Sequence, residues 1–201
     1  MFFEAFEDLL SRIAARLQER GFARRGSVLF CERGGNFGLI DFQKSQKTSR
    51  EAVVFTVNLG VVSGKLVRFF SPSKKVGPPA RVSDWHWRER LGFLLAEGRD
   101  QWWSISAGTD VRRISQTLED ALIRLALPEI ERYIGDESLR DLWLARRSPG
   151  LTELQRLRNL AVLLQAIGPG HELPLVMDEL RKSSTTTANL IEKQFQLGAS
   201  A

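Results

Sequence analysis

The residue types of this 201-residue chain limit the chemistry that it can perform, since only two histidines and one cysteine are present. His86 alternates with apolar residues in a predicted strand, next to Asp84 and Arg88, where it could act as a general base. A strand histidine with a purely structural role is the more common alternative. His171 follows a Gly-Pro-Gly turn, where we expect it to be exposed, and Cys31 is expected to be buried and unreactive. These residues predict no metal site and no nucleophile.

Sequence motifs of cofactor-binding and catalytic sites are also absent. There is no glycine-rich phosphate loop, no nucleophile elbow and no dinucleotide-binding motif that opens a helix. The Gly-Gly-Asn-Phe-Gly run at 34–38 lies between two predicted strands, so a hairpin turn explains it better. We therefore expect no cofactor.

Polar residues within apolar strands are the strongest candidates for binding. Gln43 and Lys44 end one predicted strand, Asn58 lies inside the next, and Arg99 leads into a pair of tryptophans. A buried amide or guanidinium must find partners, so Asn58 and Arg99 either lock strand ends and turns or line a site. The candidate binding residues, which include three lysines of a basic segment and two tryptophans, are Gln43, Lys44, Asn58, Lys74, Lys75, Trp85, Arg99 and Trp102.

Positive charge is concentrated in one segment of the chain. The net charge is +5, but eight Lys and Arg residues between Phe42 and Ser83 stand against Glu51 alone, so this segment carries +7 and the remainder −2. Such charges are either solvated loop charges or a patch that attracts an acidic partner or a nucleic acid. The basic segment Lys44–Arg81 is thus a possible nucleic-acid-binding site.

The hydrophobic pattern predicts an α+β fold with a five-stranded antiparallel sheet, packed with an N-terminal helix and C-terminal helices. Three strands form a meander, and a second hairpin spans 85–105. We expect an α+β domain over 1–147 with a basic Pro/Gly loop at 63–83, and a C-terminal helical hairpin over 151–197 that packs on the same domain. Helices are predicted at 2–20, 109–134 with a kink or a restart at Pro128, 136–143, 152–167 with a capping box, and 175–195 with a Ser/Thr run in its middle that favours fraying or a break.

Several features predict a cytoplasmic protein. A single cysteine cannot form an internal disulfide, which favours a reducing compartment. The N-terminus carries Glu4, Glu7 and Asp8, which a secretory signal peptide would lack. The longest apolar run, at 160–164, is far shorter than the roughly 20 residues that a membrane span needs.

Four ordered segments resemble the strand motifs of a bacterial family known as domain of unknown function 4304. They are Ile-Asp-Phe-Gln-Lys-Ser at 40–45, Phe-Thr-Val-Asn-Leu-Gly at 55–60, Arg-Leu-Gly-Phe at 90–93 and Gly-Arg-Asp-Gln-Trp-Trp at 98–103. The segment at 21–26 also fits the approach of that family from its first helix to its first strand. The resemblance covers about residues 2–134. It implies a bacterial cytoplasmic α+β domain and supplies no established activity or catalytic residue.

Three hypotheses on function follow. The first is a non-catalytic binding or protein-interaction domain, similar to immunity or adaptor proteins, because catalytic motifs are absent and five tryptophans are present. The second is a nucleic-acid-binding protein that uses the basic loop. The third is an enzyme whose site combines the scattered residues His86, Arg99 and Asp100. The sequence predicts a protein partner for the first hypothesis and leaves open whether the chain forms a homo-oligomer.

Overall fold

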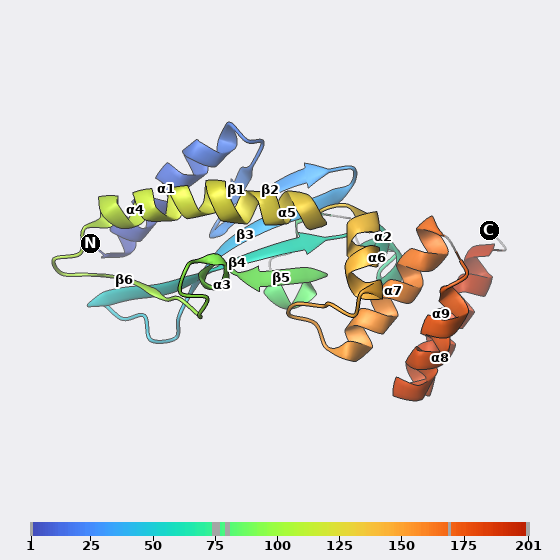
Figure 1. Ribbon diagram of the computed structural model, residues 1–201. Coiled ribbons are helices and arrows are strands. Elements are labelled where there is room, and N and C mark those ends of the chain that lie inside the picture. Colours follow the sequence, from blue (N-terminus) through green and yellow to red (C-terminus); the bar gives the residue numbers. More distant parts are fainter. Residues whose placement is uncertain (1, 74–76, 79–80, 169, 200–201) are drawn as a thin grey trace.

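The computed structural model describes residues 2–73, 77–78, 81–168 and 170–199, and it has an antiparallel sheet with long helices over one face (Figure 1). The strands β1 to β5 lie side by side in the order of the sequence, and β6 pairs with β4. This confirms the predicted α+β class. The strand bounds are β1 Ala23–Arg25, β2 Val28–Arg33, β3 Asn36–Lys44, β4 Ala52–Val62, β5 Trp87–Arg90 and β6 Trp103–Ser106.

Strand β4 is the centre of the sheet. Its side chains alternate as predicted, and Val53, Phe55 and Val57 are completely buried on the helix-covered face. One edge of β4 pairs with β3, while the other pairs with β6 along 52–55 and with β5 along 58–61. The 11 residues of β4 extend over roughly 37 Å at 3.4 Å per residue, so two short strands fit end to end on one edge.

The hairpin predicted for 85–105 does not form. Strand β5 ends at Arg90 and is followed at once by the short helix α3, Leu91–Leu94, after which the chain continues to β6. A Cβ atom on Gly92 would lie 2.4 Å from the carbonyl oxygen of Arg99, so the absence of a side chain permits this close crossing of the chain. The sheet has six strands among the described residues, one more than predicted, because Ala23–Arg25 forms the additional strand β1.

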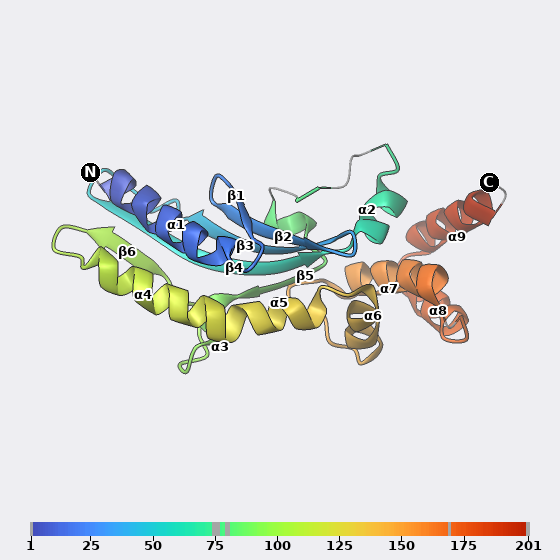
Figure 2. The same cartoon turned by 90° about the horizontal axis from the view of Figure 1, so that it is seen from above.

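Helices α1 (Phe2–Gln18), α4 (Val111–Ala121) and α5 (Leu127–Tyr133) cover one face of the sheet (Figure 2). The ring of Phe6 packs 5.0 Å from that of Phe55, and the ring of Tyr133 packs 5.2 Å from that of Trp87. The stripe that α1 buries is the predicted one: Phe6, Leu9, Leu10, Ile13 and Leu17.

Around Pro128 a new helix begins, which is one of the two predicted outcomes. A π-helical turn at Leu122–Ala126 joins α4 to α5, and Pro128 lies in the first turn of α5. Ala126 and Leu127 keep right-handed helical backbone angles, so this turn links the two helices directly.

The opposite face of the sheet carries shorter elements. The segment predicted as a loop at 63–83 contains helix α2 (Gly64–Phe70), whose first turn is capped by the Ser63 hydroxyl, and the 3-10 turn η1 (Val82–Asp84). These elements cover a second apolar cluster, which contains Phe37, Leu39, Val62 and Trp85. The sequence did not predict α2, because this helix has only seven residues and therefore a weak signal. The only residues that indicate it are the N-cap serine and four apolar residues.

The C-terminal residues form helices α6 (Asp136–Leu144), α7 (Glu153–Ile167), α8 (Leu173–Ser183) and α9 (Thr185–Ala199) at one end of the sheet (Figure 1). Among the described residues after 150 there are three helices and not the two of the predicted hairpin, because the break predicted for the Ser/Thr run occurs at Ser184, which adopts an extended conformation. None of the described helices combines the length and the apolar character that a membrane-spanning helix needs.

Helix α7 begins with the predicted capping box, which gives a first test of the fold. The Gln155 backbone N–H donates to the Thr152 hydroxyl over 3.3 Å, and the Thr152 backbone N–H donates to the side-chain oxygen of Gln155 over 2.9 Å. We expect Thr152→Ala to lower the free energy of unfolding by about 1 kcal/mol in urea denaturation. Thr152→Ser keeps the hydroxyl and should match the wild type; equal losses in both variants would contradict a role for the cap.

Candidate binding cleft on the open face of the sheet

A cleft of about 450 Å³ lies on the sheet face that the long helices leave uncovered. We call this the open face and define it by Asp41, Asn58 and Arg90, which the strand register places in one row across β3, β4 and β5. Directly paired residues of neighbouring strands point their side chains to the same face. The residues that line the cleft are Gln43, Asn58, Val82, Arg88, Glu89, Arg90, Phe93, Asp100 and Gly150.

A chain of hydrogen bonds forms the floor of the cleft. The Asn58 side-chain amide donates to Gln43 Oε1 over 2.9 Å and also bonds the Asp41 carboxylate. The Ser27 hydroxyl donates to Asp41 Oδ1 over 2.8 Å. Burial raises the pKa of Asp41, and the bonds from Ser27 and Asn58 oppose that rise. The side-chain amides of Asn58 and Gln43 are thus held in a fixed orientation by a hydrogen-bond network that includes the buried Asp41 carboxylate.

Arg88 connects two loops at the wall of the cleft. Its Nε donates to the Gly150 carbonyl oxygen over 2.5 Å, and its Nη1 donates to the Val82 carbonyl oxygen over 3.2 Å. A Cβ atom on Gly150 would lie 2.2 Å from the Arg88 side chain, and the backbone φ of Gly150 is +74°, so this position requires glycine. The linker between α6 and α7 is therefore part of the cleft.

Arg90 organises the other wall. Its Nη1 donates to the Asp100 carboxylate, and its guanidinium lies 5.4 Å from the centre of the Trp102 ring. The Trp102 indole N–H donates to the same carboxylate over 3.1 Å. Trp102 remains 36% exposed and Phe93 49% exposed, so two large aromatic side chains face solvent beside the polar floor.

A family model described as "Domain of unknown function (DUF4304)" matches residues 13–132, which is more than half of the chain. The chain belongs to the DUF4304 family. No curated protein and no solved structure matched in the other two comparisons. The DUF4304 match begins within α1 and ends within α5, so it includes the whole sheet, whereas Gly150 and helices α6 to α9 lie beyond it.

The DUF4304 sheet brings three of the predicted candidate residues together. Gln43 and Asn58 form the floor of the cleft, and Trp102 adjoins it through Arg90 and Asp100.

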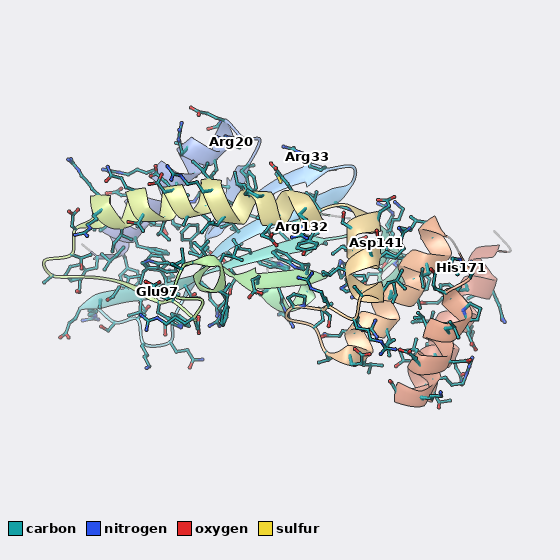
Figure 3. All side chains as sticks on the ribbon, viewed as in Figure 1. Arg20, Arg33, Glu97, Arg132, Asp141 and His171 are labelled. Atoms are coloured by element: carbon teal, nitrogen blue, oxygen red, sulfur yellow. The ribbon has the colours of Figure 1, made fainter. Side chains whose placement is uncertain are left out.

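The remaining candidates lie elsewhere or are not described. Trp85 is 1% exposed in the second apolar cluster. Lys44 points to the helix-covered face, with its ammonium 5.5 Å from the ring centre of Phe3. Arg99 is exposed in the loop between α3 and β6, in which Figure 3 labels Glu97. Lys74 and Lys75 lie outside the described residues.

The basic segment of the DUF4304 chain does not form one patch among its described residues. Lys44 pairs in register with Phe55, near one end of β4, whereas Lys65 follows the other end and forms an ion pair with Asp136 over 2.8 Å. The seven steps along the strand from Phe55 to Val62 separate these ends by roughly 24 Å at 3.4 Å per residue. The positive charges are therefore distributed over two regions.

His86 is a buried structural residue and is not among those that line the cleft. Its Nδ1 accepts a hydrogen bond from the Ser63 N–H over 2.9 Å, which fixes a ring without a proton on that nitrogen. Burial, with a smaller contribution from the charge of Arg158, lowers the pKa of His86 from 6.5 to about 4. The cleft thus combines neither His86 nor Arg99 with Asp100.

The other histidine is exposed, as predicted: His171 lies between α7 and α8, next to Glu172 (Figure 3). Within the described residues, no cluster of three His, Cys, Asp or Glu side chains could hold a metal ion.

Sequence reasoning missed most of the cleft walls. The alternation of Trp87 with Arg88 and Arg90 did indicate that both arginines share the face opposite the buried tryptophan. No local signal indicates that Arg88 contacts Gly150, because 62 residues separate them in the chain. Phe93 falls within the hairpin predicted for 85–105, but it lies on the short helix α3 and is exposed.

Proposed function

We propose that this protein is a bacterial cytoplasmic, non-catalytic protein-interaction domain, similar to immunity or adaptor proteins, that binds its partner at the open face. The observation that carries the proposal is the exposure of Trp102 and Phe93 beside a cleft lined by Arg88 and Arg90. Tryptophan, other aromatic residues and arginine are enriched where protein interfaces concentrate their binding energy.

The charges of the cleft favour a protein over a nucleic acid as the partner. Arg88 and Arg90 are balanced by Glu89 and Asp100, so the lining carries no net positive charge. Binding to a phosphate backbone depends on an excess of Lys and Arg. The basic segment could supply such an excess only from two separated regions among its described residues, which weakens the nucleic-acid alternative.

The test is affinity purification from the native bacterium in nuclease-treated and untreated lysates, with wild-type protein and a Trp102→Ala variant. We expect a protein partner that survives nuclease treatment and binds Trp102→Ala about thirtyfold more weakly, which corresponds to about 2 kcal/mol for a central interface tryptophan.

Leu125→Ala is a matched control, because Leu125 is also 36% exposed but lies on the π-helical turn between α4 and α5, over the opposite sheet face. It should bind the partner as the wild type does. If Trp102→Ala recovered as much of the protein partner as the wild type, the open face would not be the binding surface. Recovery of nucleic acid that disappears on nuclease treatment, with no protein partner, would contradict the proposal and favour the basic segment.

A further inference from the structure

We propose that the cleft recognises a carboxylate group of the partner protein, held by Gln43, Arg88 and Arg90. This inference rests on the proposed function, since it names the chemistry by which the open face selects its partner. It is carried by hydrogen-bond donors on three lining side chains that are held in place but have no partner among the described residues.

The amide of Gln43 presents donors to the cleft. Its carbonyl oxygen accepts from Asn58 over 2.9 Å, so the orientation of the amide is fixed and its two N–H groups remain. No described residue accepts a hydrogen bond from this Nε2, and the side chain is exposed at the end of β3. A donor that is held in place before binding loses little conformational freedom when a ligand arrives.

The two guanidinium groups are likewise held with donors to spare. Arg88 uses Nε and Nη1 on two carbonyl oxygens, and its Nη2 has no bond within the described chain. Arg90 uses Nη1 on Asp100 while it stacks on Trp102, which leaves Nε and Nη2. A guanidinium carries five N–H donors in a planar fork that matches the two oxygens of a carboxylate.

Each acidic side chain of the cleft already holds part of Arg90 or its neighbour. Asp100 Oδ2 accepts from both the Arg90 guanidinium and the Trp102 indole, and Glu89 Oε1 accepts from the Arg90 backbone N–H over 3.0 Å. These two acidic residues also offset the two arginines in charge. The lining therefore matches a planar carboxylate through the geometry of its donors, and it offers no net positive charge to hold a dianionic phosphate or a polyanion.

Small probes test the site directly in the intact protein. We would titrate it with N-acetylglutamate α-amide, which carries a side-chain carboxylate, and with N-acetylalanine, which carries a terminal one. The neutral N-acetylglutamine α-amide and inorganic phosphate serve as comparisons. The readout is the NMR signals of the Gln43 side-chain amide, the Arg88 and Arg90 Nε–H groups and the Trp102 indole. We expect saturable shifts with at least one carboxylate probe at millimolar concentration and none with the neutral analogue.

Variants assign the binding to the named donors. Gln43→Met should weaken carboxylate binding about tenfold, because it removes a hydrogen bond to a charged group. Arg90→Met should weaken it at least as much. Gln46→Met and Arg112→Met replace exposed residues of the same types outside the cleft, in the β3–β4 loop and on α4, and should bind as the wild type does. Thermal unfolding verifies that each variant is folded.

The outcomes separate this inference from the proposed function. If no carboxylate probe binds, if phosphate binds as tightly, or if Gln43→Met binds like Gln46→Met, the carboxylate site is wrong. In each case the proposed function still stands when Trp102→Ala loses the protein partner. If Trp102→Ala retains its partner, the proposed function fails, whatever the probes show.

Discussion

Replacing Gly60 with alanine is expected to lower the free energy of unfolding by about 3 kcal/mol, the upper part of the range for inserting atoms into a packed core. Gly60 lies near the C-terminal end of β4, and the indole of Trp85 packs directly on its backbone. A Cβ atom there would lie 1.9 Å from Cε3 of Trp85, and Trp85 is only 1% exposed, so the ring has no free space to move into. Urea denaturation measures the loss.

A double-mutant cycle identifies the cause. Trp85→Ala alone should cost about 3 to 5 kcal/mol, because it leaves a cavity in the second apolar cluster. Adding Gly60→Ala to that variant should cost little more, since the ring that the new methyl group meets is gone. Gly170→Ala is the control, because nothing lies within 4 Å of its Cβ position. If the two losses added in full, the contact between Gly60 and Trp85 would not explain the destabilisation.

The elements that the sequence predicts well are those whose signal is local and periodic. The alternation along β4 is decided within the strand, because every second residue faces the same core. The stripe of α1 is decided in the same way, and Thr152 and Gln155 are only three residues apart. For such elements, neighbours in sequence are also neighbours in space, so no knowledge of the rest of the fold is needed.

The pairing of β5 and β6 could not be predicted in that way. Two apolar runs joined by a turn-like sequence favour a hairpin. The 11-residue length of β4 offers each of these strands a partner already in place, and Gly92 permits the crossing between them. The predicted hairpin was wrong because the competing partner, β4, lies about 30 residues before β5 and about 50 residues before β6.

In the cleft, too, the contacts between neighbouring strands could be predicted, whereas those between distant parts of the chain could not. Asn58 was singled out as an amide in an apolar strand, and its contact with Gln43 follows from the register of β3 and β4. Trp85 was chosen by residue type alone, which does not distinguish a tryptophan at an interface from one packed on a glycine. The wall at Gly150 comes from beyond the DUF4304 match and depends on how the C-terminal helices are placed.

A second large effect is expected from pH, and its origin is His86. Its pKa is about 4 in the folded protein and 6.5 in a solvated histidine, so the unfolded chain binds the proton more readily. The neutral ring stabilises the fold fully above about pH 6.5, and this contribution is lost as the pH falls from 6.5 to about 4. At 1.36 kcal/mol per pKa unit, the loss by pH 4 is about 3 kcal/mol.

The matched variant for this effect is His86→Asn, because the asparagine side chain can still accept from the Ser63 N–H but does not titrate. Other carboxylates titrate in the same range, so the quantity to measure is the difference in unfolding free energy between wild type and variant at each pH. We expect that difference to shift by about 3 kcal/mol in favour of the variant between neutral pH and pH 4. His171→Asn removes the exposed histidine instead and should follow the wild type. A difference between wild type and His86→Asn that is constant with pH would mean that the ring is not held neutral by burial beside Arg158.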